Sequence, residues 1–317
     1  MKIILMIFLC VASLASAVLS PRMSIEAGGN VQSIIVDHDT LFVGTSAGTL
    51  EGYKLEDGRA TFKFSFDTIK DFMGDMIAPK VFSIDKLEGA ETYLAVLQAS
   101  SGARSLVVIE GTHATELINA SANMFITKAK FLDANTILIA LMSNELIRFD
   151  RKNKKIIYQK QVNTSHFSDF ALNETKTKVA SSCESGEITI TDTLSGKTLK
   201  VLNSGNVDNV YKVDFKKEVV LAAGQDRRGI IYHTATGAYD RYDAPFLIYA
   251  GALSPTTHLA AFAFNEENDI VLFDTTTKAQ IYTLRGQKST LNTIVFATEK
   301  DIVSGSDDKF IMIWRLP

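Results

Sequence analysis

Short apolar runs separated by small and polar residues recur along the chain from about residue 20 onward. The runs are five to eight residues long and rich in Val, Ile, Leu, Phe and Tyr, with Gly, Asn, Asp and Ser between them. Runs of this length and composition, bounded by turn-forming residues, predict β-strands joined by tight turns. Since no helical pattern longer than three turns occurs, we expect an all-β fold.

One of these runs recurs at a nearly constant spacing. Its aligned copies end at positions 53, 109, 149, 191, 232, 273 and 314, so the spacings are 56, 40, 42, 41, 41 and 41 residues. The sixth unit shows four strand-like runs, at residues 247–253, 258–264, 269–273 and 280–284. Four strands in about 41 residues are typical of a propeller blade, which buries its faces only against neighbouring blades. We therefore expect a single seven-bladed β-propeller over residues 18–317.

The seventh unit reaches Pro317 after only three strands. We expect residues 23–26 to supply the fourth strand of this blade. Such pairing joins the two ends of the ring and covers sheet edges that otherwise promote aggregation.

Residues 304–314 read Ser-Gly-Ser-Asp-Asp-Lys-Phe-Ile-Met-Ile-Trp, which resembles the end-of-blade motif of the WD40-repeat family. In that family an Asp braces the turn before a strand that ends in Trp. The resemblance implies these roles for Asp308 and Trp314. Asp226 and Glu267 stand at the matching places of units five and six and are expected to brace their turns in the same way.

The chain also departs from the WD40-repeat pattern. The Gly-His pair of the family becomes Gly286-Gln287, and units one to four lack the turn Asp. The resemblance covers roughly residues 24–317 as a repeat pattern, with the seventh unit matching best and the second matching least.

The wide first spacing leaves about 15 extra residues between units one and two. Within them, apolar residues fall at the helical positions i, i+3, i+4, i+7 and i+8, so we expect a short helix over residues 67–77. Asp67 would cap its start, and Pro79 follows its end. The apolar face either packs on the ring or docks a partner, and Met and Phe suit an adaptable docking surface. Its members are Ile69, Phe72, Met73, Met76 and Ile77.

The sequence shows no assembled catalytic, metal-binding or cofactor-binding set. The five histidines are scattered over five units, and no Gly-x-Ser-x-Gly nucleophile elbow occurs. The acidic stretches 265–269 and 307–308 have ligands of the calcium type, but we expect solvated loops and a braced turn there. Cys183 aligns with Ser306 and is expected to be a small buried residue rather than a reactive thiol. We thus predict neither enzymatic activity nor a resident cofactor.

The net charge and the N-terminal residues indicate which partners and which cellular compartment to expect. Lys and Arg number 33 and Asp and Glu 36, a net charge of −3, which argues against a nucleic-acid partner. Residues 1–17 combine Lys2, an apolar run and the small residues Ala15, Ser16 and Ala17, a pattern typical of a cleaved secretory signal peptide. We expect a monomer in a bacterial periplasm, with no membrane insertion.

These features favour a non-catalytic periplasmic platform that binds proteins. An exported WD40-like chain without a lipid anchor resembles the propeller-type accessory protein encoded with periplasmic nitrate reductase in epsilonproteobacteria. That resemblance implies help in maturing or assembling the enzyme, with nitrate reductase subunits or associated cytochromes as clients. The predicted helix lies in a connection between blades, on the face of the ring where the turns between second and third strands also emerge. Four residues of those turns are further candidate docking residues: Glu184, Asp226, Arg227 and Glu266.

Two other functions stay open at this point. A propeller enzyme of the quinoprotein or hydrolase type is one, although quinoprotein propellers carry a Trp in nearly every blade and this chain has only Trp314. A scaffold for outer-membrane protein assembly is the other, and the missing lipobox argues against it.

Overall fold

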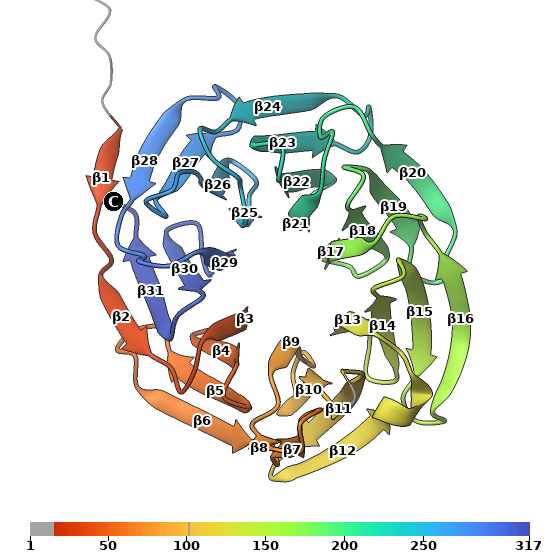
Figure 1. The fold of residues 1–317 in the computed structure, drawn as a ribbon. Helices are drawn as coiled ribbons and strands as arrows, with labels where there is room; N and C mark the ends of the chain where they lie inside the picture. The colour runs from red at the N-terminus through yellow and green to blue at the C-terminus, as the bar shows by residue number, and fades with distance from the viewer. Residues whose placement is uncertain (1–15, 101) are drawn as a thin grey trace, which may run out of the picture.

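Seven blades, six with four strands and one with five, surround a central channel (Figure 1). The computed structural model describes residues 16–100 and 102–317. Within this part of the chain the secondary structure consists of strands and one short 3-10 helix, η1 (Ala120–Ala122). The predicted all-β, seven-bladed propeller is therefore confirmed.

Each of the first four blades is an antiparallel sheet whose strands follow chain order from the channel to the rim. Blade 1 contains β3 (Val31–Asp37), β4 (Thr40–Thr45), β5 (Thr49–Lys54) and β6 (Ala60–Ser65). Blade 2 contains β9 (Val81–Lys86), β10 (Thr92–Gln98), β11 (Arg104–Glu110) and β12 (His113–Ile118). Blade 3 contains β13 (Ile126–Phe131), β14 (Thr136–Leu141), β15 (Glu145–Asp150) and β16 (Lys155–Gln161). Blade 4 contains β17 (Phe167–Leu172), β18 (Lys178–Cys183), β19 (Ile188–Asp192) and β20 (Thr198–Leu202).

The remaining three blades repeat this order, and the last two also take a strand from the N-terminal side of the chain. Blade 5 contains β21 (Val210–Lys216), β22 (Val219–Gly224), β23 (Arg228–His233) and β24 (Tyr239–Asp243). Blade 6 contains β25 (Gly251–Leu253), β26 (Leu259–Ala263), β27 (Ile270–Asp274) and β28 (Gln280–Leu284), with β1 (Ala17–Leu19) added outside. Blade 7 contains β29 (Leu291–Phe296), β30 (Asp301–Ser306), β31 (Phe310–Arg315) and β2 (Met23–Glu26).

The predicted closure of blade 7 is confirmed. β2 pairs antiparallel with β31, in a register that places Met23 opposite Ile313 and Glu26 opposite Phe310. Ile25 is only 7% exposed and packs in a cluster of buried residues shared by blades 7 and 1. The pairing therefore closes the ring through both backbone hydrogen bonds and apolar burial.

β1 was not expected from the sequence. It runs parallel to β28 as a fifth strand of blade 6, and the backbone N–H of Arg285 donates to the carbonyl of Leu19 at 2.9 Å. The N-terminal strands thus lie along the rims of blades 6 and 7 in succession (Figure 1). Of the predicted signal peptide, residues 1–15 lie outside the described part of the chain.

The core lies between the blades because the two middle strands of each blade are covered on both faces. All six residues of β14 are buried, which explains its continuous apolar sequence. The outer strand β16, in contrast, is exposed at six of its seven positions. Trp314 is fully buried in the cluster that joins blades 6 and 7.

Carboxylates on inner strands tie neighbouring blades together. Asp85 accepts a hydrogen bond from the backbone N–H of Phe131 in blade 3 at 2.7 Å. Asp169 of blade 4 and Asp214 of blade 5 make the same contact to the inner strand of the next blade, at 3.2 and 2.8 Å. These carboxylates satisfy N–H groups that face the channel, where no further strand can pair with them.

Turn bracing follows the WD40 resemblance in two units. Asp308 accepts hydrogen bonds from the Phe310 N–H and the Ser306 hydroxyl, both at 2.8 Å. Asp226 likewise accepts from the backbone N–H of Arg228 at 3.1 Å. Gln287, which replaces the family His, is 4% exposed and extends the blade 7 network by donating a hydrogen bond to the Ser304 hydroxyl at 2.7 Å.

The prediction that Glu267 braces its turn is wrong. Glu267 is exposed, whereas Asp269 is 1% exposed and is bound by Asn265 and Arg285. The reason is turn length: six residues separate the paired residues Ala263 and Ile270, whereas five residues separate the corresponding pairs in blades 5 and 7. In this longer turn the buried carboxylate is Asp269, one residue before Ile270, whereas Asp226 and Asp308 each lie three residues before the next paired residue.

The alternation of strand direction defines the face on which each connection lies. Within every blade the second-to-third-strand turn emerges on the same side of the ring as the connection to the next blade. We call this side the cross-over face. It carries η1 and a two-stranded hairpin of β7 (Ile69–Lys70) and β8 (Met76–Ile77), both of which lie in connections between blades.

Candidate protein-docking site

The insertion between blades 1 and 2 forms a hairpin and not the predicted helix. Ile69 pairs with Ile77 and Lys70 with Met76, and a tight turn joins the two strands. Gly74 has a φ of +94°, in the left-handed region that a right-handed helix excludes. An isolated helix of about eleven residues is marginal, so the local turn interactions override the helical spacing of its apolar residues.

Asp71 organises this turn. Its carboxylate accepts hydrogen bonds from the backbone N–H groups of Met73 at 2.8 Å and Asp75 at 2.9 Å. The backbone closes the same turn, since the N–H of Asp71 donates to the carbonyl of Asp75 and the N–H of Gly74 donates to that of Asp71. Side chains of this type compete with helix formation by binding nearby backbone groups.

The hairpin holds apolar side chains in solvent. Phe72 is 92% exposed, Met73 75% and Met76 59%, whereas Ile69 and Ile77 at its base are half-buried. The five residues predicted to share one helix face are therefore divided between a base on the ring and an exposed tip. Contiguous exposed apolar side chains on a folded protein mark candidate interaction sites.

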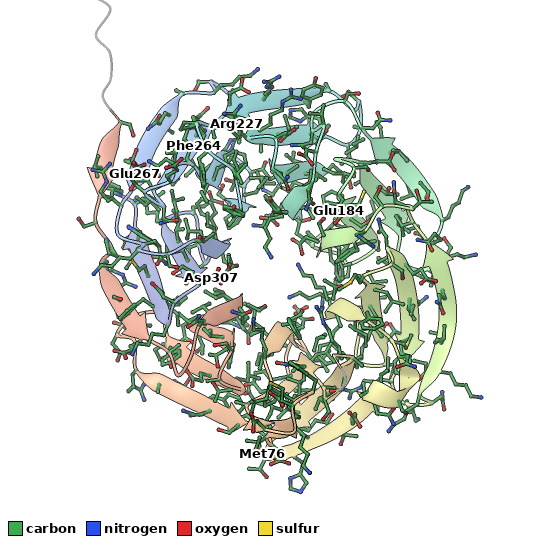
Figure 2. The ribbon with its side chains drawn as sticks, in the orientation of Figure 1. Met76, Glu184, Arg227, Phe264, Glu267 and Asp307 are labelled. Atoms are coloured by element: carbon green, nitrogen blue, oxygen red, sulfur yellow. The ribbon has the colours of Figure 1, made fainter. Side chains whose placement is uncertain are left out.

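The other predicted docking residues lie in turns of blades 4, 5 and 6. Figure 2 shows Glu184 and Arg227 in different sectors of the ring from Met76, so the cross-over face does not gather them into one patch. Arg227 and Glu266 are exposed. The carboxylate of Asp226 is only 5% exposed and binds its own turn, which leaves it little surface for a partner.

A shallow apolar groove lies on the same face beside blade 3, and the sequence analysis missed it. Phe125 precedes β13 and Met142 follows β14, and they are 48% and 41% exposed. They line a groove of about 620 Å³ together with His166, whose Nδ1 lies 3.2 Å from a carboxylate oxygen of Glu184. The sequence signal for this groove is the presence of the apolar residues Phe125 and Met142 in connections directly beside strands. Glu184 therefore lies beside this groove through its contact with His166.

The remaining candidate reactive side chains are buried or lie beside acidic residues at the surface. Cys183 is 2% exposed, as expected, and its Sγ lies 3.2 Å from the Ser185 hydroxyl. His38 and His233 lie beside Asp37 and Asp240 at the surface. Across residues 16–100 and 102–317, no group of three His, Cys, Asp or Glu side chains has an arrangement that could hold a metal ion.

The same residues include no helix with the length and hydropathy needed to cross a membrane. In comparisons with known proteins, no protein-family model and no curated protein sequence matches the chain. The arguments about function therefore rest on the residues and their geometry.

Proposed function

We propose that this propeller is a non-catalytic platform that docks a protein client through the hairpin of β7 and β8. One observation carries the proposal: the turn braced by Asp71 holds Phe72 and Met73 in solvent. Because the backbone is already ordered, binding loses less conformational entropy than it would with a mobile loop. Phe and Met are enriched in protein interfaces, where burial of their exposed area stabilises the complex.

We propose that the apolar groove of Phe125 and Met142 is a second docking surface for the same client. It lies on the same cross-over face, beside the next connection between blades. A client that covers both the hairpin and the groove would bury apolar surface in two neighbouring sectors. Glu184 at the groove edge would then contribute at the polar rim, where charges affect association rate and specificity more than affinity.

The docking experiment compares two double variants in pull-downs from a periplasmic extract of the native host. We expect Phe72→Ser with Met73→Ser to lose the client, because both side chains leave the interface, and to keep the melting temperature of the wild type. The matched control is Leu199→Ser with Val201→Ser, which removes two apolar side chains that are 49% and 42% exposed on outer strand β20. Equal capture by the wild type and the hairpin variant would reject docking through the hairpin.

The narrower proposal concerns the client and the compartment. We propose a periplasmic chain that helps to mature or assemble nitrate reductase, with a reductase subunit or an associated cytochrome as client. Its support is the resemblance of an exported WD40-like chain to the accessory protein of that system and the signal-peptide pattern of residues 1–17. Mass spectrometry of the captured proteins tests the client, and intact mass tests cleavage after Ala17. Capture of unrelated proteins only, or an exported chain that retains Met1, would contradict these two points.

A further inference from the structure

The central channel contains a cavity of about 770 Å³. The inner strands of all seven blades contribute to its lining. A cavity of this size lies within the range of small-molecule sites. Its wall differs from the rest of the protein in charge. The ionisable side chains on it include six basic residues, Arg104, Lys128, Lys130, Lys176, Lys212 and Lys216, and four acidic residues, Asp85, Asp169, Glu174 and Asp214.

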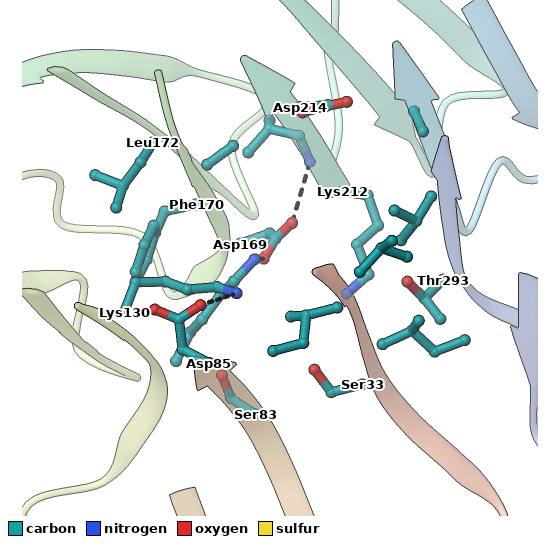
Figure 3. A pocket seen from close by; sticks show the side chains of 18 of the residues that line it. Ser33, Ser83, Asp85, Lys130, Asp169, Phe170, Leu172, Lys212, Asp214 and Thr293 are labelled. Atoms are coloured by element: carbon teal, nitrogen blue, oxygen red, sulfur yellow. Dashed lines mark hydrogen bonds and ion pairs between the residues drawn. The ribbon is translucent and has the colours of Figure 1, made fainter. Parts of the chain in front are cut away.

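The excess of positive charge is notable because the whole chain carries a net charge of −3. Three channel lysines have carboxylate partners: Lys128 binds Asp169 at 2.7 Å, Lys130 binds Asp85 at 3.0 Å, and Lys216 binds Asp214 at 2.9 Å. Lys212 differs, since within the described residues its ammonium makes no hydrogen bond or ion pair. Figure 3 shows this ammonium projecting into the channel.

The surroundings of the Lys212 and Lys130 ammonium groups disfavour their charged forms. The Asp169 carboxylate favours the charged form of Lys212, but burial and the nearby ammonium groups of Lys128 and Lys130 outweigh it and lower the pKa of Lys212. Burial likewise lowers the pKa of Lys130, against the attraction of Asp85. An anionic group among these lysines would favour their charged forms and so offset both the mutual repulsion and the cost of burial.

Unpartnered hydroxyls provide an independent observation. The Ser83 side chain is 4% exposed, and its Oγ is buried without a hydrogen-bond partner. The Oγ1 of Thr127, also on the channel wall, is in the same condition. Buried polar groups in folded proteins are nearly always hydrogen-bonded, so exceptions at a cavity wall point to a ligand. Both hydroxyls can donate to an oxygen acceptor.

We propose that the channel binds a small multivalent oxyanion, a compound that carries phosphate or carboxylate groups. The Lys212 ammonium is its main contact, the ammonium groups of Lys128 and Lys130 add attraction, and the Ser83 hydroxyl donates to one of its oxygens. Lysine suits this role because its ammonium is a compact charge with three donors. The proposal is independent of the docking hairpin, which lies outside the channel.

Isothermal titration calorimetry with inorganic phosphate and with succinate, in chloride buffers of equal ionic strength, tests the site. We expect saturable binding of at least one of them, and the stronger response identifies the class as phosphates or carboxylates. Lys212→Met should weaken that binding about tenfold or more, which is the usual effect of losing a hydrogen bond to a charged group. The matched control is Lys155→Met, on the exposed outer strand β16, which should bind as the wild type does.

Ser83→Ala separates ligand binding from folding. If Ser83 only occupies space in the wall, its removal leaves affinity unchanged and the melting temperature equal or higher. If it donates to the ligand, affinity falls several-fold without a loss of stability. The proposal is overturned if neither anion binds saturably, or if Lys212→Met binds like the wild type. Should Lys212→Met fail to fold, the Ser83→Ala titration decides by itself.

Discussion

Asp169 connects three blades through a single side chain. It is 3% exposed, accepts from the Lys128 ammonium of blade 3 at 2.7 Å, and accepts from the Val213 N–H of blade 5 at 3.2 Å. Burial opposes its ionisation, but Lys128, Lys212 and these hydrogen bonds prevail and lower the pKa of Asp169. The ionised carboxylate is therefore part of the native state at neutral pH.

We predict that Asp169→Asn lowers the free energy of unfolding at pH 7 by about 2 kcal/mol, the contribution of a hydrogen bond to a charged group. Urea denaturation measures this change. Because the folded-state pKa lies below the unfolded value of 3.8, the stabilisation is present above that pH and is lost as the pH falls below it. The difference between wild type and variant should therefore shrink on acidification. Asp67→Asn, at an exposed residue, serves as the control and should change stability by less than about 0.5 kcal/mol.

The roles of individual residues were predictable where a local motif determined them. Asp308 and Asp226 brace turns as the repeat pattern indicated. Glu267 does not, because one extra residue in its turn changes which acidic side chain points inward. Lys212 could not have been singled out, since its lack of a partner depends on inner strands that are brought together only by the ring.

At the level of elements, the hairpin of β7 and β8 is the clearest difference from the sequence prediction. The strands could be predicted because buried middle strands are continuously apolar and the turns between them carry small polar residues. The 67–77 insertion also had a regular pattern, but its apolar residues are exposed at a tip and do not form a packed face. Periodicity indicates a helix only when the apolar face has something to pack against, and a single sequence does not show this.

We predict that Asp71→Ala frees the hairpin turn and leaves the ring intact. The amides of Met73 and Asp75 lose their carboxylate acceptor, so their hydrogen exchange should accelerate. The global free energy of unfolding should change by less than about 0.5 kcal/mol, since the turn is exposed. Amide exchange followed by NMR or mass spectrometry measures both effects. Asp75→Ala, in the same turn, is the matched control; equal exchange in the two variants would refute the role of Asp71.

For the whole molecule, the pairing of β2 with β31 is the feature that closes the ring. We predict that deletion of residues 18–27 costs several kcal/mol, because it removes a strand ladder and exposes the edge of β31. Ile25→Ala should reproduce about 3 kcal/mol of this loss by opening a cavity between blades 7 and 1. Val18→Ala, at a residue 55% exposed on β1, should cost less than about 0.5 kcal/mol. Thermal and urea unfolding of the three variants provide the comparison, and unchanged stability of the deletion would contradict closure by β2.

The pairing of β2 with β31 also determines when the native ring can exist. Met23 is among the first residues of the described chain to be synthesised, and its partner Ile313 is among the last. Contacts between residues so far apart in sequence are slow to form, because a long loop must close before they stabilise anything. Six blades can form their own sheets as the chain emerges, but blade 7 and its seam with blade 1 must wait. Until β31 is made, β2 has no partner and blade 7 is incomplete, so the nascent protein exposes unpaired strand edges through which it can associate with other chains.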